Sequence, residues 1–361
     1  MKHLQYKKFP LSFLGIVIIL MFIISSCTKD KPEQPDIDRL EKGILILNEG
    51  LFNMNNCSIT YYNFRTGEVI PDIFLLKNKR GLGDTGSDLQ LYGSKLYCVV
   101  NVSEQLEIID ARTCVSIKRL PLNGKQPRKL TFHQNKVYVS CYDGSVVKID
   151  TATLAIDEIA YAGSNPEGIC VANNKLYVAN SGGLNFPDYG ETVSVFDLNT
   201  FSHIKDIDVN PNPYTLLSDD QGYVYLISRG NYLDFPPTLQ KIDSQTDEVV
   251  YHYSADLKIT NMAISQNHAY FYHYDFNHSH SSGISRMNLY SENPDVTDFI
   301  KDASVIKTPY CIAIDPTNQD VYVADALQYT VNGEIYCFNT NGKKKLKFEA
   351  GINPAAIVFI P

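Results

Sequence analysis

Side chains suited to holding a large polar ligand are concentrated in a few loops of this 361-residue chain. They combine aromatic rings, which offer wide apolar contact, with amides, hydroxyls and guanidinium groups that can hydrogen bond to a polar edge. We expect the ligand contacts to be Phe52, Asn53, Asp84, Ser87, Asn101, Arg128, Asn180, Phe186, Tyr189, Arg229, Tyr232, Phe235, Phe276 and Tyr329. Exposed aromatic residues gathered on one surface are typical of a binding surface, although some of these rings could instead pack beneath their own loops.

No constellation typical of catalysis accompanies these residues. None of the eight histidines belongs to a His-Glu-x-x-His motif, and there is no Gly-x-Ser-x-Gly nucleophile elbow. His273, His278 and His280 could bind a metal, but their spacing within a single loop indicates a solvated loop more strongly than a metal site. We therefore expect no catalytic residue, no resident cofactor and no metal.

The loops follow a hydrophobic segment that returns seven times, with 39 to 52 residues between successive copies. A period of roughly 40–50 residues filled with short strands is typical of a β-propeller blade. The strand formed by this hydrophobic segment begins at Leu45, Tyr97, Tyr138, Tyr177, Tyr225, Tyr270 and Tyr322. The strand that follows it along the chain ends each time in Asp or Asn, often with Thr three residues later, as in Asp110 and Thr113. These acids and amides are expected to cap turns and not to catalyse a reaction.

A third, proline-led strand precedes most copies, as at Pro127, Pro166, Pro213 and Pro309. Proline suits the first residue of a strand, where no ladder donor is needed. The last such strand, 355–359, has no blade after it, and the first blade has no such strand before it. We therefore predict an all-β, seven-bladed β-propeller over residues 43–361, closed when the C-terminal strand completes the first blade. The long aromatic loops then all lie on one face.

The N-terminus carries export signals. Three lysines precede an apolar run, residues 11–24, that is too short to span a bilayer and suits a signal peptide. Ile24-Ser25-Ser26-Cys27 resembles a bacterial lipobox, so we expect residues 1–26 to be removed and Cys27 to be acylated. Residues 27–42 then form a flexible tether, and the protein is held on a membrane by lipid alone.

Charge and cysteine content exclude some functions. The chain has 32 basic and 40 acidic residues, and loss of the three lysines in residues 1–26 leaves 29 against 40, a formal charge of −11. Such a surface disfavours nucleic acid as a partner. Seven cysteines remain after Cys27 without the spacing of a disulfide framework or a zinc site, so we expect them to fill the core.

Three segments resemble the surface propeller lipoproteins of gut Bacteroidetes. They are Leu82–Tyr97, Tyr177–Gly183 with Thr192–Val195, and Ser228–Tyr232. Members of that family bind vitamin B12 at the cell surface and pass it to a TonB-dependent outer-membrane transporter. The resemblance implies an outer-membrane, lipid-anchored protein, exposed at the cell surface, that binds a corrinoid such as cobalamin and delivers it to such a transporter.

Two other functions remain open at the level of sequence. One is a hydrolase or lyase with a metal on the propeller axis, although the inner-strand starts offer few ligands, with Glu167 their only acid. The other is a scaffold whose loops bind only protein.

Overall fold

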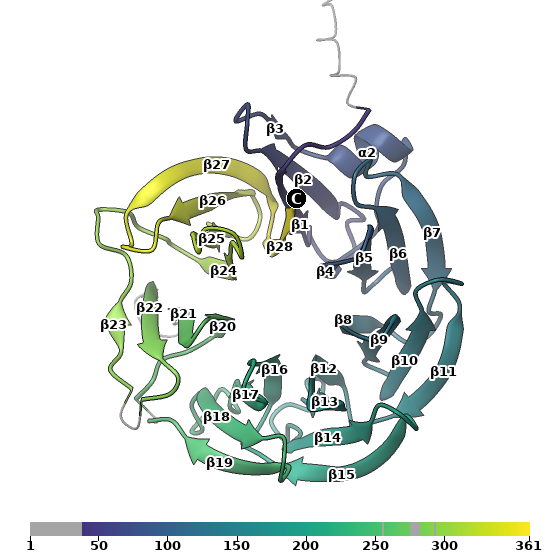
Figure 1. The fold of residues 1–361 in the computed structure, drawn as a ribbon, viewed down its shortest axis with the longest axis vertical. Helices are drawn as coiled ribbons and strands as arrows, with labels where there is room; N and C mark the ends of the chain where they lie inside the picture. Colours follow the sequence, from purple (N-terminus) through teal and green to yellow (C-terminus); the bar gives the residue numbers. More distant parts are fainter. Residues whose placement is uncertain (1–37, 255, 275–281, 292–293) are drawn as a thin grey trace, which may run out of the picture. The chain divides into compact units, whose positions relative to one another are not determined.

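The computed structural model of the chain describes residues 38–254, 256–274, 282–291 and 294–361. The predicted signal peptide and Cys27 lie outside the described residues, as do Phe276, His278 and His280. The strands form seven four-stranded antiparallel sheets arranged around a central axis (Figure 1). The protein is therefore an all-β, seven-bladed β-propeller, as the repeat predicts.

Six of the blades are each built from four consecutive strands, which follow one another from the axis outward. Blades 2 to 4 contain β4 (Gly86–Tyr92), β5 (Lys95–Val100), β6 (Gln105–Asp110) and β7 (Ser116–Pro121); β8 (Pro127–His133), β9 (Lys136–Cys141), β10 (Ser145–Asp150) and β11 (Ile156–Tyr161); and β12 (Pro166–Ala172), β13 (Lys175–Asn180), β14 (Thr192–Asp197) and β15 (Ser202–Asp208). Blades 5 to 7 contain β16 (Pro213–Ser218), β17 (Tyr223–Ser228), β18 (Thr238–Asp243) and β19 (Glu248–His252); β20 (Asn261–Ser265), β21 (His268–Tyr274), β22 (Ser282–Asn288) and β23 (Thr297–Asp298); and β24 (Pro309–Ile314), β25 (Val321–Asp325), β26 (Asn332–Phe338) and β27 (Lys344–Ile352).

Blade 1 joins the two ends of the propeller. The C-terminal strand β28 (Pro354–Ile360) pairs with β1 (Gly43–Asn48), which continues outward to β2 (Ser58–Asn63) and β3 (Val69–Ile70). The predicted closure by the C-terminal strand is confirmed. Because β28 lies on one side of β1 and β2 on the other, β1 has no free edge that could recruit another chain.

The core lies between neighbouring blades. Most residues in the second strand of each blade are buried, and the repeated tyrosines Tyr97, Tyr138, Tyr177 and Tyr225 are at most 1% exposed. Val99 of blade 2, for example, shares a cluster with Val137 of blade 3. Burial of each such aliphatic side chain contributes roughly 1.5–3 kcal/mol, which explains why the apolar segment recurs in every blade.

The repeated acids cap turns, as predicted. Asp110 Oδ1 accepts hydrogen bonds from the backbone N–H groups of Arg112 (3.0 Å) and Thr113 (2.9 Å). Asp197 does the same for Asn199 and Thr200, and these bonds from Thr200 and Asn199 hold the pKa of Asp197 below its ordinary value.

Helix is confined to one short segment among the described residues, α2 (Ile73–Asn78). It begins where the Asp72 side chain accepts the Leu75 N–H at 3.0 Å, which satisfies an orphan donor of the first turn. In the part of the chain described, no helix is long and apolar enough to cross a membrane.

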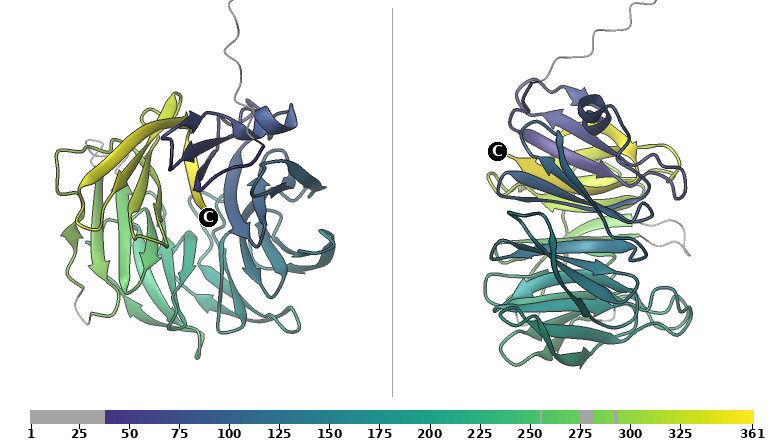
Figure 2. Two further views of the ribbon diagram at one scale, coloured as in Figure 1. Left: turned by 45° about the horizontal axis from the view of Figure 1, so that its top comes forward. Right: turned by 90° about the vertical axis from the view of Figure 1, so that its right-hand side faces the viewer.

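The two faces of the ring differ. The loops between the second and third strands of the blades are long in blades 1, 4, 5 and 7, and they lie with the starts of the inner strands on what we call the loop face. The opposite turn face carries short hairpins such as that between β12 and β13. In the edge-on view, long loops project from one side of the disc and the C-terminus lies on the other (Figure 2).

Candidate functional site: the loop face and the central channel

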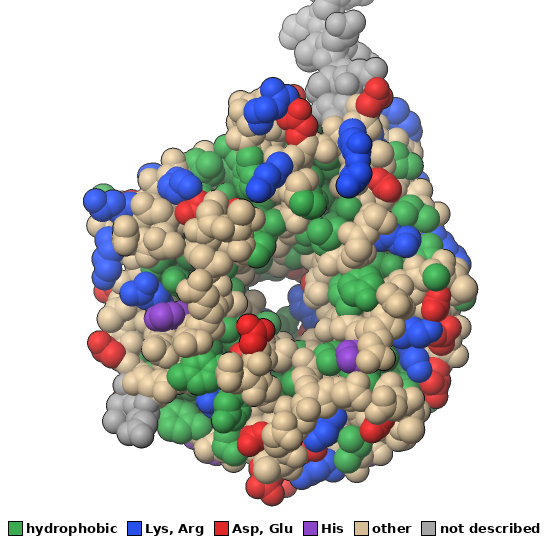
Figure 3. Space-filling view, viewed as in Figure 1, with side chains coloured by type: hydrophobic (Ala, Val, Ile, Leu, Met, Phe, Trp, Pro, Cys, Tyr) green, Lys and Arg blue, Asp and Glu red, His purple; other side chains and the backbone are tan. Residues whose placement is uncertain are grey.

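A channel runs through the centre of the ring. It encloses about 1050 Å³ and is lined by the inner strands of all seven blades together with several loop-face residues. The opening is visible in the space-filling view (Figure 3). A cavity of this size is large enough for a small organic molecule.

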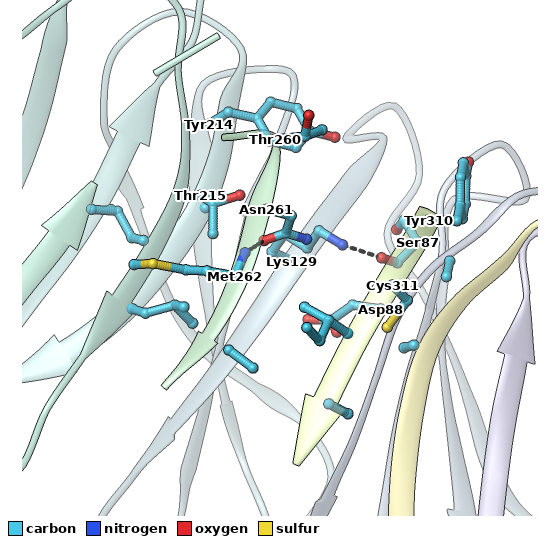
Figure 4. A pocket seen from close by; sticks show the side chains of 18 of the residues that line it. Ser87, Asp88, Lys129, Tyr214, Thr215, Thr260, Asn261, Met262, Tyr310 and Cys311 are labelled. Carbon is cyan, nitrogen blue, oxygen red and sulfur yellow. Dashed lines mark hydrogen bonds between the residues drawn. The ribbon is translucent and has the colours of Figure 1, made fainter. Parts of the chain in front are cut away.

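The inner strands are built so that certain side chains project at the loop-face end of the channel. The pairing of each proline-led strand with its neighbour shifts register just after the proline, between Pro127 and Leu130 and between Pro213 and Thr215, for example. Such a bulge re-aims the residues within it. Arg128, Tyr214 and Tyr310, which directly follow these prolines, all line the channel. Figure 4 shows the rings of Tyr214 and Tyr310 at one end of the channel, on opposite sides.

A buried ionic cluster lies at this end of the channel. Arg128 pairs with Glu167 at 3.0 Å, and the Glu167 side chain is only 1% exposed. The hydroxyl of Tyr142 donates to the same carboxylate, while the Arg128 guanidinium lies 4.7 Å from the centre of the Tyr142 ring. Burial, reinforced by the charge on Glu167, raises the pKa of Tyr142 and keeps this donor protonated.

A second guanidinium is stacked on a tyrosine nearby. The guanidinium carbon of Arg229 lies 3.1 Å from the centre of the Tyr214 ring. Arg128 Nη2 contacts the Tyr214 hydroxyl at 3.5 Å, so the two arginines meet the same tyrosine. Both arginines, predicted as ligand contacts, are therefore brought together at the mouth of the channel.

An aromatic ledge joins the loops of blades 4 and 5. Phe186 and Tyr189 have ring centres 6.2 Å apart, and Tyr189 and Tyr232 have ring centres 6.0 Å apart, both edge-to-face. Phe186 is 62% exposed and Tyr232 is 53% exposed, with Leu184 and Leu233 beside them at 68% and 69%. Phe235 is exposed on the same loop as Tyr232. This ledge (Leu184, Phe186, Tyr189, Tyr232, Leu233, Phe235) is a wide apolar surface next to the channel.

Glycines hold the two loops of the ledge in shape. A side chain at Gly190 would place its Cβ 2.1 Å from the Asn180 carbonyl oxygen, and one at Gly230 would place its Cβ 2.0 Å from the Phe235 carbonyl oxygen. Gly230 also has φ +69°, a conformation that glycine adopts at least cost. The loops are therefore closed tightly at their bases, which limits the freedom of the rings that they carry.

A second aromatic group lies across the channel. Tyr329 contacts both Tyr310 and Tyr274 edge-to-face, with ring centres 6.0 and 6.5 Å apart. Tyr329 and Tyr232 both have positive φ, 63° and 61°. Such values are uncommon for bulky residues, but Leu154 and Phe201 share them in short turns between outer strands, so they indicate tight turns and do not by themselves mark a ligand site.

Several of the predicted polar contacts are already hydrogen bonded within the protein. Asp84 accepts the backbone N–H groups of Asn53 (3.1 Å) and Asn55 (2.8 Å), so that it braces the loop that exposes Phe52. Asn180 donates to Thr192 and Ser194 and accepts from the Gly163 N–H.

Two further polar residues form similar internal contacts. The side chain of Asn101 donates to the Pro127 carbonyl at 3.0 Å, and that of Ser87 donates to the Arg128 carbonyl at 2.8 Å. These residues position the loops and inner strands, and their role as ligand contacts stays a prediction. Phe52, by contrast, is 71% exposed.

The channel also contains groups that the sequence did not single out. Glu167 is not the only acid near the inner-strand starts, because Asp88 and Glu49 lie there too and line the channel directly. Glu49 accepts the Tyr310 hydroxyl at 2.5 Å, and this bond links blade 1 to blade 7. Asp88 lies two residues after the start of β4, and the pairing of β4 with β5 shifts register there as it does after the prolines. That equivalence is the signal by which Asp88 could have been found.

Metal-binding and redox groups are sparse. The described residues contain no group of three or more His, Cys, Asp or Glu side chains placed to hold a metal ion. Cys57, Cys98, Cys114, Cys141, Cys170, Cys311 and Cys337 are free and buried, as the prediction of core cysteines requires. Burial raises the pKa of the Cys311 thiol to about 12, which makes it unreactive.

The fold and the loop face define a β-propeller whose central channel is lined in part by aromatic side chains. Residues 42–360 match the family described as "Domain of unknown function (DUF5074)", and the chain belongs to that family. No curated protein matches the sequence.

Solved structures show the same architecture. A quinonprotein alcohol dehydrogenase-like protein from Bacteroides thetaiotaomicron superposes with a TM-score of 0.67 at 16% identity, over 89% of this chain and 79% of that one. Hydrazine synthase from Kuenenia stuttgartiensis superposes with a TM-score of 0.59 at 15% identity, over 70% and 76%. The computationally designed Ika8 protein gives a TM-score of 0.56 at 14% identity, over 88% and 91%. At these identities the likeness concerns the fold alone.

Proposed function

We propose that this protein is a non-enzymatic, lipid-anchored binding protein that holds a corrinoid such as vitamin B12 on its loop face and delivers it to a TonB-dependent outer-membrane transporter. The observation that carries the proposal is the exposed aromatic ledge of blades 4 and 5 beside the channel mouth.

The chemistry of the ledge suits a corrinoid. Cobalamin is a broad, flat ring fringed with amides, so it needs apolar faces for its body and hydrogen-bonding groups at its edge. Phe186, Tyr189 and Tyr232 supply the former, and the channel mouth beside them supplies tyrosine hydroxyls and guanidinium groups. Tightly closed loop bases lower the entropy lost when a ligand orders the loops.

Anchoring and delivery depend on parts of the sequence and on the family resemblance. The lipobox at Cys27 would place the propeller on a membrane through a flexible tether. The resemblance to surface lipoproteins supports the outer surface of the outer membrane as its location. Such a protein can collect a scarce ligand and hand it to a transporter held in the same membrane.

Spectroscopy of the full-length protein purified from its own membranes tests the identity of the ligand. A bound corrinoid colours the protein, and its absorption bands should disappear on denaturation and filtration. Equilibrium dialysis of stripped protein against cyanocobalamin, haem or a neutral glycan then separates these ligand classes. Retention of haem or glycan but not of cyanocobalamin would contradict the corrinoid proposal.

Two measurements address the other functions. A stoichiometric metal ion in the pure protein would support an axial enzyme site. Co-purification of a transporter with a protein that retains none of the three ligands would support a scaffold that binds only protein.

A further inference from the structure

The two arginines at the channel mouth have similar aromatic surroundings and different ionic ones. Arg128 lies over Tyr142, and Arg229 lies over Tyr214. Arg128 has the buried carboxylate of Glu167 as its partner at 3.0 Å. Within the described ranges, Arg229 forms no direct ion pair, and the charge of Glu167, which is paired with Arg128, reaches it only through space.

A partly buried guanidinium without an anion is costly. Removal from water penalises a charged group, and stacking on an aromatic ring returns only about 0.5–2 kcal/mol. The acids in and beside the channel are engaged elsewhere, since Glu167 is bound by Arg128 and Tyr142. Glu49 accepts from Tyr310, and Asp88 accepts from the backbone of Leu89 and Leu130.

We infer that the mouth of the channel contains an oxyanion-binding site centred on Arg229, which takes the carboxylate or phosphate group of a small ligand. In this site the ligand's anion occupies the position that Glu167 fills beside Arg128. The planar guanidinium can hold either group with two parallel hydrogen bonds. Tyr214 and Tyr232, which line the same channel, offer apolar contact to the body of the ligand.

A third cation lines the same cavity as Arg128 and Arg229. Lys129 donates to the Ser87 carbonyl at 2.5 Å, as Figure 4 shows, and it forms no ion pair with a residue that the structure describes. An ammonium has three donors, so two remain for water or ligand. Lys129 therefore adds to the positive potential that an anion meets in the channel.

The inference does not depend on the corrinoid proposal. It rests on the surroundings of Arg229 alone, and although both ligands would use the channel mouth, anion binding is measured by thermal unfolding and cyanocobalamin binding by dialysis, so either result can fail without the other.

Thermal unfolding of the full-length protein tests the site with benzoate, benzamide, inorganic phosphate and chloride at equal ionic strength. Benzamide matches benzoate in shape but carries no charge. Benzoate, phosphate or both should raise the unfolding midpoint by about 2–4 °C at tenfold excess over Kd, and benzamide and chloride should not. A rise with benzoate alone identifies a carboxylate, and a rise with phosphate alone identifies a phosphate.

Variants locate the effect. Arg229→Gln should abolish the rise, whereas Arg65→Gln, which removes an exposed arginine of the turn face, should preserve it. Arg229→Lys keeps the charge but loses the paired hydrogen bonds, so it should weaken apparent affinity about tenfold and serves if Arg229→Gln does not fold. The inference is overturned if no anion raises the midpoint, if benzamide or chloride acts equally, or if both Arg229 variants respond as the wild type does.

Discussion

Arg128 and Glu167 follow the leading prolines of two neighbouring inner strands, and their side chains pair at 3.0 Å across the boundary between blades 3 and 4. The bulge after each proline places Arg128 in the wall of the channel and Glu167 beside it. This pair, together with Tyr142, gives the loop face a fixed polar base beside its exposed rings.

Replacement of Glu167 by Gln should destabilise the protein by about 3 kcal/mol, because it leaves the buried Arg128 without a counter-charge. Urea unfolding followed by circular dichroism measures this change. Glu41→Gln is the matched control, since Glu41 pairs with the 73%-exposed side chain of Arg65 and solvent screens that pair. Equal losses of unfolding free energy in the two variants would show that the buried pair stabilises the fold no more than an exposed pair does.

Joint replacement of Tyr232 and Phe235 by Ala should weaken cyanocobalamin binding by at least about 2 kcal/mol, or roughly thirtyfold in Kd, if these rings anchor the ligand. Equilibrium dialysis provides the affinities. Tyr161→Ala is the control, because Tyr161 is equally prominent at 67% exposure but lies on the outer strand β11. Unchanged affinity in the double variant would remove both residues from the site.

Replacement of Asp84 by Ala should release the loop that carries Phe52, because two backbone N–H groups lose their acceptor. Hydrogen exchange should become faster at Asn53 and Asn55 while the core strands keep their protection. Asp197→Ala, which removes a turn-face acid, should leave these two amides unchanged. Slow exchange at Asn53 and Asn55 in the Asp84 variant would mean that the loop is held by other contacts.

The architecture could be predicted from sequence because local and global signals agree. The apolar strand led by tyrosine, the turn acid and the leading proline recur in most copies, and the unmatched strand at the C-terminus has only one place to pair. These features depend on residues close together in the sequence, or on matching the number of inner strands to the number of blades.

The site could be predicted only in part, because side-chain partners come from distant blades. The exposure of Tyr232 follows from its position in a long loop, and the sequence indicates that loop. The use of Asp84 as a brace for Asn53 depends on contacts between residues 31 positions apart, and the sequence alone does not contain them. The unequal partners of Arg128 and Arg229 likewise depend on how blades 3, 4 and 5 meet.

Alkaline pH should unfold the protein by ionising buried tyrosines. Burial raises the pKa of Tyr97 from 10.0 to about 12, and that of Tyr329 also to about 12. A raised pKa means that the fold favours the neutral phenol, so this stabilisation is complete below pH 10 and is lost as pH rises towards 12. Phenolate absorbance at about 295 nm and circular dichroism should therefore change together above about pH 11. Full ionisation near pH 10 with an intact fold would contradict this.

Titration calorimetry with cyanocobalamin tests the central claim most directly. The stripped wild-type protein should bind one equivalent with measurable heat, and the variant with Ala at positions 232 and 235 should bind far more weakly. Absence of any heat with the correctly folded wild-type protein, checked at two temperatures, would contradict a corrinoid-binding loop face.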